Sequence, residues 1–255
     1  MASRIHIASS LIILACIGTT GCATSRLEVS NPSRTPNARG IVFAVAGAGG
    51  SDATSTALRQ EIEAAGLPLN VESVDWSHGH GRFLSDQMHW EHARSEGVRL
   101  AERVTAYRAE CPTGDVYLVG HSAGSAVALA AGDVLPAGSL RRIVLLAPSV
   151  SADYDLRPAL RSAQDGIDVF LSGRDVLYLG VGAAITGTAD RRWLSPAAGR
   201  TGFRQKAECS EDAALYQKLH QHGWQPGVEW TGNHGGHYDG YKPAYLRSYV
   251  LPLFQ

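Results

Sequence analysis

Residues 116–131 read VYLVGHSAGSAVALAA, and this stretch decides the fold that we expect. Four residues (116–119) predict a short strand, the pentapeptide 120–124 has the pattern G-x-S-x-G, and small apolar residues predict a helix over 125–131. At such a turn the serine takes a strained conformation that projects its hydroxyl, and side chains at the two glycine positions would collide with the neighbouring strand and helix. Ser122 is therefore a candidate nucleophile, the alternative being a serine that only caps the helix.

Strand and helix patterns alternate along the rest of the chain. Predicted strands cover residues 41–47, 69–76, 142–147 and 167–171, with a weaker one over 227–231. Predicted helices cover residues 54–66, 93–110, 156–163 and 213–222, and residues 241–253 close the chain as a helix or an extended tail. This alternation predicts an α/β fold, with a mostly parallel central sheet and helices on both faces.

Composition limits the domain number and the class of partner. The chain has 255 residues, 44% of them hydrophobic, and a formal net charge of -1. These values fit one domain over residues 40–255 and exclude a strongly basic nucleic-acid binder. Residues 179–207 contain five glycines without a clear period, and we expect a lid-like insertion there. The oligomeric state is left open.

The N-terminus has the pattern of an export signal. Arg4 precedes the mostly apolar stretch 5–17, which is shorter than the roughly 20 residues of a permanent membrane-spanning helix. The sequence T-T-G-C ending at Cys22 resembles the lipobox of bacterial lipoproteins, in which the signal is cut before a cysteine that is then acylated. Thr19 departs from the aliphatic residue usual at that position, and the sequence I-L-A-C makes Cys16 the alternative anchor.

We therefore interpret residues 1–22 as a lipoprotein-type signal peptide, residues 23–39 as a flexible polar tether and Cys22 as the lipid anchor. The expected location is a bacterial membrane, the periplasmic side of the outer membrane, because Ala23 rather than aspartate follows the anchor. The alternative is ordinary secretion with cleavage near Ala23. The two other cysteines, Cys111 and Cys209, are expected to be free thiols.

From about Gly40 to its C-terminus the chain resembles the α/β-hydrolase superfamily, on the strength of the G-x-S-x-G pattern in its strand–turn–helix context. The resemblance implies an oxyanion hole built by the loop after the first buried strand. That loop reads AGAGG (46–50), and Ala46 stands where many relatives have histidine. Because the donors are backbone groups, the departure leaves the hole intact. We assign the donors to the N–H groups of Ala48 and Ala123, with Gly49 as the alternative to Ala48.

The resemblance also implies the chain order serine, acid, histidine. Asp175 ends the turn Ser172-Gly173-Arg174-Asp175 that follows the predicted strand 167–171, and it is the expected acid. The alternatives after the preceding strand are Asp153 and Asp155. His237 stands between glycine and tyrosine, as the base does in relatives, and it is preferred to His234.

Two further predictions concern the surroundings of the site. Residues 76–79 end the second predicted strand at the same edge as Ser122, and we expect them to line the pocket. The insertion 179–207, which contains Trp193, is expected to cover the site. His78, His80, His89 and His92 lie close in sequence, but their spacing matches no zinc signature, so we expect neither a metal nor another cofactor.

The predicted function is that of an exported serine hydrolase that cleaves a small-molecule or lipid-like carboxylic ester through an acyl-enzyme. An acyltransferase or a peptidase would use the same triad, and these activities remain alternatives. A non-catalytic lipoprotein that keeps the fold as a binding module is the alternative from another class. A metal-dependent hydrolase using the four histidines would lose activity with a chelator.

Overall fold

The computed structural model describes residues 38–182, 186–193 and 195–255. The predicted signal peptide (1–22), its Cys22 anchor and all but the last two residues of the predicted tether (23–39) lie outside the described residues. Within the part that is described, no helix combines the length and apolar character needed to cross a membrane.

Six parallel strands form one sheet in the order β2-β1-β3-β4-β5-β6. The strands are β1 (Gly40–Val45), β2 (Leu69–Val74), β3 (Asp115–His121), β4 (Arg142–Leu146), β5 (Ile167–Leu171) and β6 (Leu219–Gly223). Every residue of β1 is buried, which accounts for its continuous apolar sequence. The predicted α/β class with a parallel sheet is confirmed.

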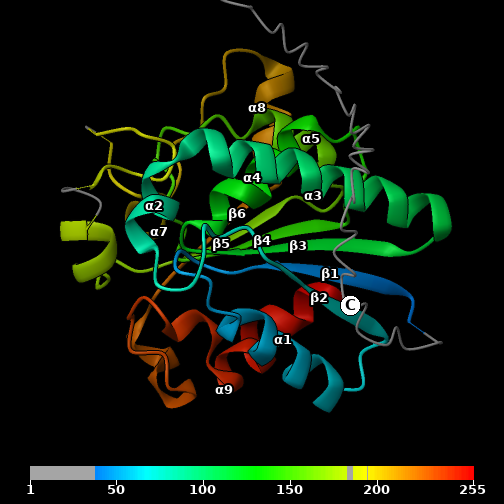
Figure 1. Cartoon of the computed structure of the whole chain (residues 1–255), viewed down its shortest axis with the longest axis horizontal. Coiled ribbons are helices and arrows are strands. Elements are labelled where there is room, and N and C mark those ends of the chain that lie inside the picture. The colour runs from blue at the N-terminus through cyan, green and yellow to red at the C-terminus, as the bar shows by residue number, and fades with distance from the viewer. Residues whose placement is uncertain (1–37, 183–185, 194) are drawn as a thin grey trace, which may run out of the picture. The chain divides into compact units, whose positions relative to one another are not determined.

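Helices cover both faces of the sheet (Figure 1). One layer consists of α3 (Trp90–Glu110), α4 (Gly124–Val134), α5 (Arg157–Ser162) and α8 (Ser210–Tyr216). The opposite layer consists of α1 (Ala53–Ala64), α9 (Pro243–Tyr245) and the turns Leu246–Val250 and Leu251–Phe254 that end the chain. The short helices α2 (Phe83–Met88) and α7 (Ala198–Thr201) lie at the carboxyl ends of the strands.

Alternate residues of β1 belong to two separate cores, one on each face. Phe43 packs in the core that includes Val104 of α3, whereas Val42 packs in the core that includes Leu58 of α1. The two cores hold the sheet rigidly between the helix layers. The carboxyl ends of its strands can therefore present side chains at fixed positions.

Small residues allow α3 and α4 to approach closely. A Cβ placed on Gly97 of α3 would lie 2.5 Å from the Cβ of Ala130 in α4, so no larger residue fits there. The helix that follows the predicted nucleophile is thus clamped between α3 and the sheet.

Two predicted elements are wrong. The predicted helix over 213–222 ends in the structure at Tyr216. After a turn, residues 219–222 belong to β6, an edge strand whose polar residues gave no strand signal. The predicted weak strand over 227–231 is a 3-10 helix, Pro226–Thr231, in which the proline occupies the first turn. The six-residue α2 was not predicted, because it is too short to show helical periodicity.

The two cysteines of the described chain lie at helix ends. Cys111 directly follows α3 and Cys209 directly precedes α8. Neither forms a disulfide, and both are free thiols.

Candidate active site

Ser122 occupies a sharp turn between β3 and α4. Its φ of 51° lies in the left-handed region, which side chains other than glycine rarely adopt. A Cβ on Gly120 would lie 2.8 Å from the Cα of Ser125, and a Cβ on Gly124 would collide with the carbonyl oxygen of Ala46. The glycines therefore let strand and helix meet at the angle that exposes the serine hydroxyl to the space above the sheet.

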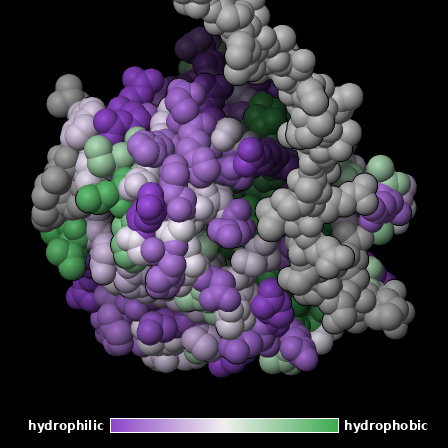
Figure 2. All heavy atoms as spheres, viewed as in Figure 1, coloured by the Kyte–Doolittle hydropathy of each residue, from purple (hydrophilic) through white to green (hydrophobic). Residues whose placement is uncertain are grey.

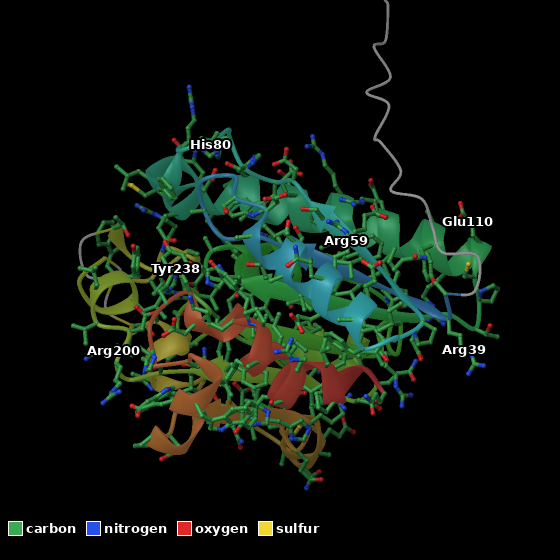
Figure 3. The ribbon with its side chains drawn as sticks, turned by 90° about the horizontal axis from the view of Figure 1, so that it is seen from below. Arg39, Arg59, His80, Glu110, Arg200 and Tyr238 are labelled. Atoms are coloured by element: carbon green, nitrogen blue, oxygen red, sulfur yellow. The ribbon has the colours of Figure 1, made fainter. Side chains whose placement is uncertain are left out.

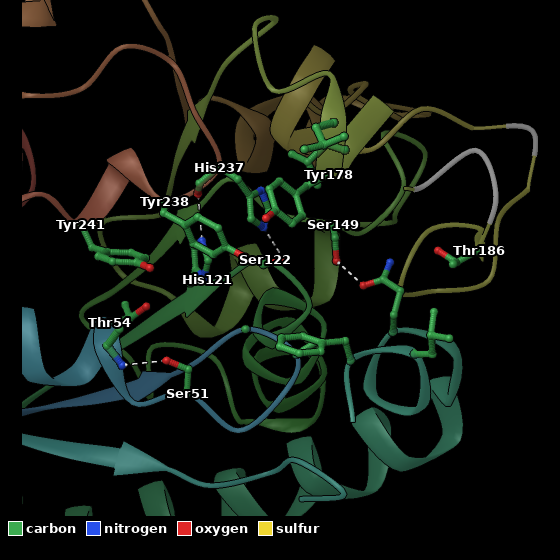
Figure 4. Close-up of a pocket in the computed structure, with 18 residues that line it drawn as sticks. Ser51, Thr54, His121, Ser122, Ser149, Tyr178, Thr186, His237, Tyr238 and Tyr241 are labelled. Atoms are coloured by element: carbon green, nitrogen blue, oxygen red, sulfur yellow. Dashed lines mark hydrogen bonds between the residues drawn. The ribbon is translucent and has the colours of Figure 1, made fainter. Parts of the chain in front are cut away.

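The structure brings Ser122, His237 and Asp175 together in one chain of hydrogen bonds. Figure 4 shows Ser122 and His237 of this chain. The Ser122 Oγ lies 2.9 Å from Nε2 of His237, and Nδ1 of the same ring lies 2.6 Å from Oδ2 of Asp175. All three residues are buried. With the ring proton on Nδ1 donated to the carboxylate, Nε2 is free to accept the hydroxyl proton of the serine.

The other candidate acids and the other candidate base lie elsewhere. Asp153 pairs with Arg204, and Asp155 pairs with Arg157. His234 is exposed, and its backbone N–H donates to Asp239. The structure therefore places Asp175 and His237, and none of these alternatives, beside Ser122.

The loop after β1 runs past the serine. Ala48 lines the cavity at Ser122. Within residues 38–182, 186–193 and 195–255, the N–H groups of Ala48 and Ala123 have no acceptor in the protein, so both are available to a ligand. The N–H of Gly49, the alternative donor, is occupied, because it donates to Oδ2 of Asp86 at 2.8 Å.

Ser122 and His237 line a cavity of about 600 Å³ at the carboxyl ends of the strands (Figure 4). The apolar and aromatic residues of its lining are Ala48, Ala53, Phe83, Leu84, Leu177, Tyr178, Leu179, Tyr238 and Tyr241. No aspartate, glutamate, lysine or arginine of the described chain belongs to this lining. A neutral, largely apolar ligand fits such a surface.

The cavity opens at one end of the molecule. In Figure 3, Tyr238 and His80 lie at that end, and Arg39 and Glu110 lie at the opposite end. Figure 2 shows a largely hydrophilic face with a hydrophobic patch at its left edge, where Figure 1 places the yellow-green helix Leu177–Gly182. Leu177 and Tyr178 of this helix are 70% and 46% exposed, so apolar surface borders the entrance.

His121 was not singled out by sequence reasoning, although it belongs to the pentapeptide. Its Nε2 lies 3.0 Å from the backbone oxygen of His237 and donates a hydrogen bond to it. Burial, together with the neighbouring His237, lowers the pKa of His121 to about 3. The ring is therefore neutral at physiological pH, and it fixes the backbone that carries His237.

The insertion contributes one side of the site. Leu179 and Thr186 of the insertion line the cavity, and Tyr178, directly before the insertion, stacks on the ring of His237 with centroids 4.7 Å apart and planes at 20°. Trp193 does not line the cavity; it is 52% exposed, and the guanidinium of Arg191 lies over its ring. Residues near the start of the insertion therefore border the site, whereas Trp193 in its middle does not.

The rings of His78, His89 and His92 lie close together. Among the residues described, however, no group of three histidine, cysteine, aspartate or glutamate side chains has a geometry that could hold a metal ion. His92 contacts the backbone oxygen of Trp76, and the ring of His78 contacts Asp86.

The prediction that residues 76–79 line the pocket is wrong. Trp76 is buried and donates from its indole to the carbonyl of Ala46, so this segment supports the loop after β1 from behind.

Fold and site together define an α/β protein that presents a serine, a histidine and an aspartate in hydrogen-bond contact at the carboxyl edge of a parallel sheet. The sequence model of the alpha/beta hydrolase family matches residues 41–250. The chain therefore belongs to the alpha/beta hydrolase family.

Solved structures resemble the chain at low sequence identity. The esterase PE8 is 18% identical and superposes with a TM-score of 0.50 over 86% of this chain and 96% of its own. A hydrolase of the alpha/beta superfamily from Xanthomonas campestris pv. campestris is 21% identical, with a TM-score of 0.47 over 85% of this chain and 100% of its own. No curated protein matches the sequence. These likenesses concern the fold, and the chemistry has to be argued from the site.

Proposed function

We propose that this protein is an exported, lipid-anchored serine hydrolase that cleaves a carboxylic ester through an acyl-enzyme. One observation carries the proposal: the continuous hydrogen-bonded chain from Ser122 through His237 to Asp175, at a cavity large enough for a small molecule. A serine that only capped α4 would need neither the histidine nor the buried carboxylate, and the side chain of Ser122 bonds His237 rather than a backbone N–H of the helix.

In this mechanism Ser122 attacks the ester carbonyl while His237 takes its proton, and Asp175 orients the imidazole and stabilises its charged form. The N–H groups of Ala48 and Ala123 stabilise the negative oxygen of the tetrahedral intermediate. Such a donor contributes on the order of 3 kcal/mol to lowering the barrier. His237 then returns the proton to the leaving alcohol, and water releases the acyl group by the same steps.

The lining of the cavity favours an uncharged ester with an apolar acyl group. Of the described lining residues, only the two histidines can carry a charge near neutral pH, and the low pKa keeps His121 neutral. A carboxylate or ammonium group on the substrate would be desolvated in this cavity without an ionic partner. Leu177 and Phe83 border the same space and offer apolar contact to an acyl chain.

The export and anchoring part of the proposal comes from the sequence of residues 1–22, with Cys22 as the acylated residue. A tether over 23–39 would leave the catalytic domain free to approach substrates near the membrane surface.

Labelling with a fluorophosphonate probe tests the catalytic part of the proposal. We expect the full chain in detergent to be labelled and to hydrolyse 4-nitrophenyl esters, with octanoate preferred to acetate. Ser122→Ala should abolish labelling and lower turnover by about 10⁴-fold or more. Ser149→Ala is the matched control, because this serine lines the same cavity but bonds Gln87 instead of a histidine. An unlabelled, inactive wild-type protein would favour the binding-module alternative.

A further inference from the structure

A buried carboxylate outside the serine–histidine–aspartate chain lies behind the loop after β1. Asp86 of α2 is 2% exposed. Its Oδ2 accepts from the N–H of Gly49 at 2.8 Å and from the hydroxyl of Ser77 at 2.6 Å. Its Oδ1 accepts from the backbone N–H of His78 at 2.9 Å and lies 2.8 Å from Nδ1 of the same residue.

These hydrogen bonds keep the carboxylate charged. Burial by itself raises the pKa of Asp86, but the donors from His78, Ser77 and Gly49 outweigh burial and hold that pKa below its ordinary value of 3.8. Asp86 is therefore an ionised acceptor at every pH at which a hydrolase of this kind works. An ionised acceptor makes stronger hydrogen bonds to backbone N–H groups than a neutral one.

Gly49, the residue that Asp86 holds, directly follows Ala48 in the loop that passes Ser122. Both polar backbone groups of Gly49 are bound to the segment around α2, since its N–H donates to Asp86 and its carbonyl accepts from the N–H of Gly81 at 3.0 Å. The ring of Phe83 lies against the Cα of Gly49, where even a Cβ would collide with it. The peptide unit after Ala48 is thus fixed from three sides, which limits the rotation of Ala48 itself.

We propose that Asp86 is a positioning residue for the oxyanion hole. Its carboxylate fixes the loop after β1 so that the N–H of Ala48 points to the carbonyl oxygen of the bound ester. This inference rests on the proposed function, because it presupposes that Ser122 attacks a carbonyl. It extends that function by making the geometry of the hole depend on α2, a helix that contributes no group to the reacting atoms.

The test compares Asp86→Asn with a matched control, Asp190→Asn. Asp190 also accepts three hydrogen bonds, from the N–H of Ser151 at 2.8 Å and from the hydroxyls of Ser151 and Thr188 at 2.6 Å each. It clamps the loop after β4, and none of these contacts reaches the loop after β1. Replacement of a carboxylate that accepts several hydrogen bonds is common to both variants. Loosening of the oxyanion hole is expected only in Asp86→Asn.

The decisive readout is the rate on a 4-nitrophenyl ester relative to the rate on its thionoester. A thiocarbonyl sulfur accepts hydrogen bonds weakly, so the hole accelerates the ester much more than the thionoester. A smaller folded fraction lowers both rates equally and leaves their ratio unchanged. Removal of a whole oxyanion donor lowers kcat roughly 10²- to 10³-fold. We therefore expect Asp86→Asn, which only loosens one donor, to lower kcat on the ester about 10- to 100-fold with KM nearly unchanged. The ratio of the ester rate to the thionoester rate should fall by a similar factor. Asp190→Asn should keep the wild-type ratio.

Ser77→Ala provides a second variant if Asp86→Asn does not fold. It removes a bond to the same Oδ2 that holds Gly49, and we expect a fall of the ratio in the same direction, by a few-fold. If Asp86→Asn folds and keeps the wild-type rate ratio, the inference is overturned. If Asp86→Asn does not fold, a wild-type ratio in Ser77→Ala overturns it in the same way. Either result leaves the proposed function untouched. A wild-type protein that hydrolyses neither substrate would overturn the proposed function, and the inference with it.

Discussion

His237 and His234 are three residues apart, yet they lie in different environments. The ring of His237 is buried between Ser122, Asp175 and the stacked Tyr178. His234 is exposed, and its backbone carbonyl accepts a hydrogen bond from Arg174. Only one of the two rings is therefore placed to accept the proton of the serine hydroxyl.

We accordingly expect His237→Ala to lower kcat by about 10⁴-fold, because the serine loses its base. His234→Ala, the matched control, should keep activity within about twofold, since surface substitutions away from the site have small effects. Steady-state kinetics on one soluble ester measure both variants. The opposite result, with His234 essential and His237 dispensable, would contradict the assignment of the base.

The sequence could predict the residues of the site that short patterns define. Ser122 stands in a recognisable pentapeptide, and the expected chain order leads from it to Asp175 and His237. The sequence could not predict the roles of Asp86 and Tyr178, because both depend on contacts between distant parts of the chain. Asp86 contacts Gly49, 37 positions away, and Tyr178 contacts His237, 59 positions away. No local pattern distinguishes a carboxylate that holds a loop from one at the surface.

The end of α4 shows how an element sets the chemistry of a side chain. Asp133 is the last residue but one of this helix, where the carbonyl end of the helix dipole disfavours negative charge. Burial, only partly opposed by the hydrogen bond from the Tyr154 hydroxyl at 2.6 Å, raises the pKa of Asp133 to about 6, above its ordinary value of 3.8.

A pH dependence of stability follows. Because the pKa of Asp133 is higher in the folded state, the protonated carboxyl stabilises the fold fully below about pH 4, and this contribution is lost as the pH rises through 6. Asp133→Asn, which stays neutral, should match the wild type at pH 4 and exceed its free energy of unfolding by about 3 kcal/mol at pH 8. Urea unfolding at the two pH values measures this difference. A difference that does not change with pH would contradict the raised pKa.

At the level of elements, the sequence could predict those with a strong period or a continuous apolar run. β1, α1, α3 and β5 are close to their predicted bounds, because burial against the sheet or within it imposes the pattern. β6 was missed because it lies at the edge of the sheet and exposes four of its five residues. Its pairing with β5 depends on the neighbouring strand, which supplies the register from Ile167 to Leu171.

The architecture of the catalytic domain separates stability from chemistry. Two cores on opposite faces hold the sheet, and the groups proposed to react all lie at its carboxyl edge. This edge is built from the loop after β1, the turn after β3, the turn after β5 and the segment around His237. Substitutions at the opposite end, where Figure 3 places Arg39 and Glu110, should therefore leave the site unchanged.

The whole chain includes the N-terminal segment that is proposed to bring this domain to a membrane. If Cys22 is acylated, each buried methylene of its acyl chains adds about 0.8 kcal/mol to membrane binding, so several chains hold the protein firmly. We expect the wild type, expressed in a diderm bacterium with an alkyne fatty acid, to be labelled and to enter the detergent phase on Triton X-114 partition. Cys22→Ser should abolish both properties, whereas Cys16→Ser should keep them. Loss of labelling in Cys16→Ser alone would move the anchor to Cys16. An unlabelled wild type in the medium would instead indicate ordinary secretion, with the catalytic domain released to act on soluble esters.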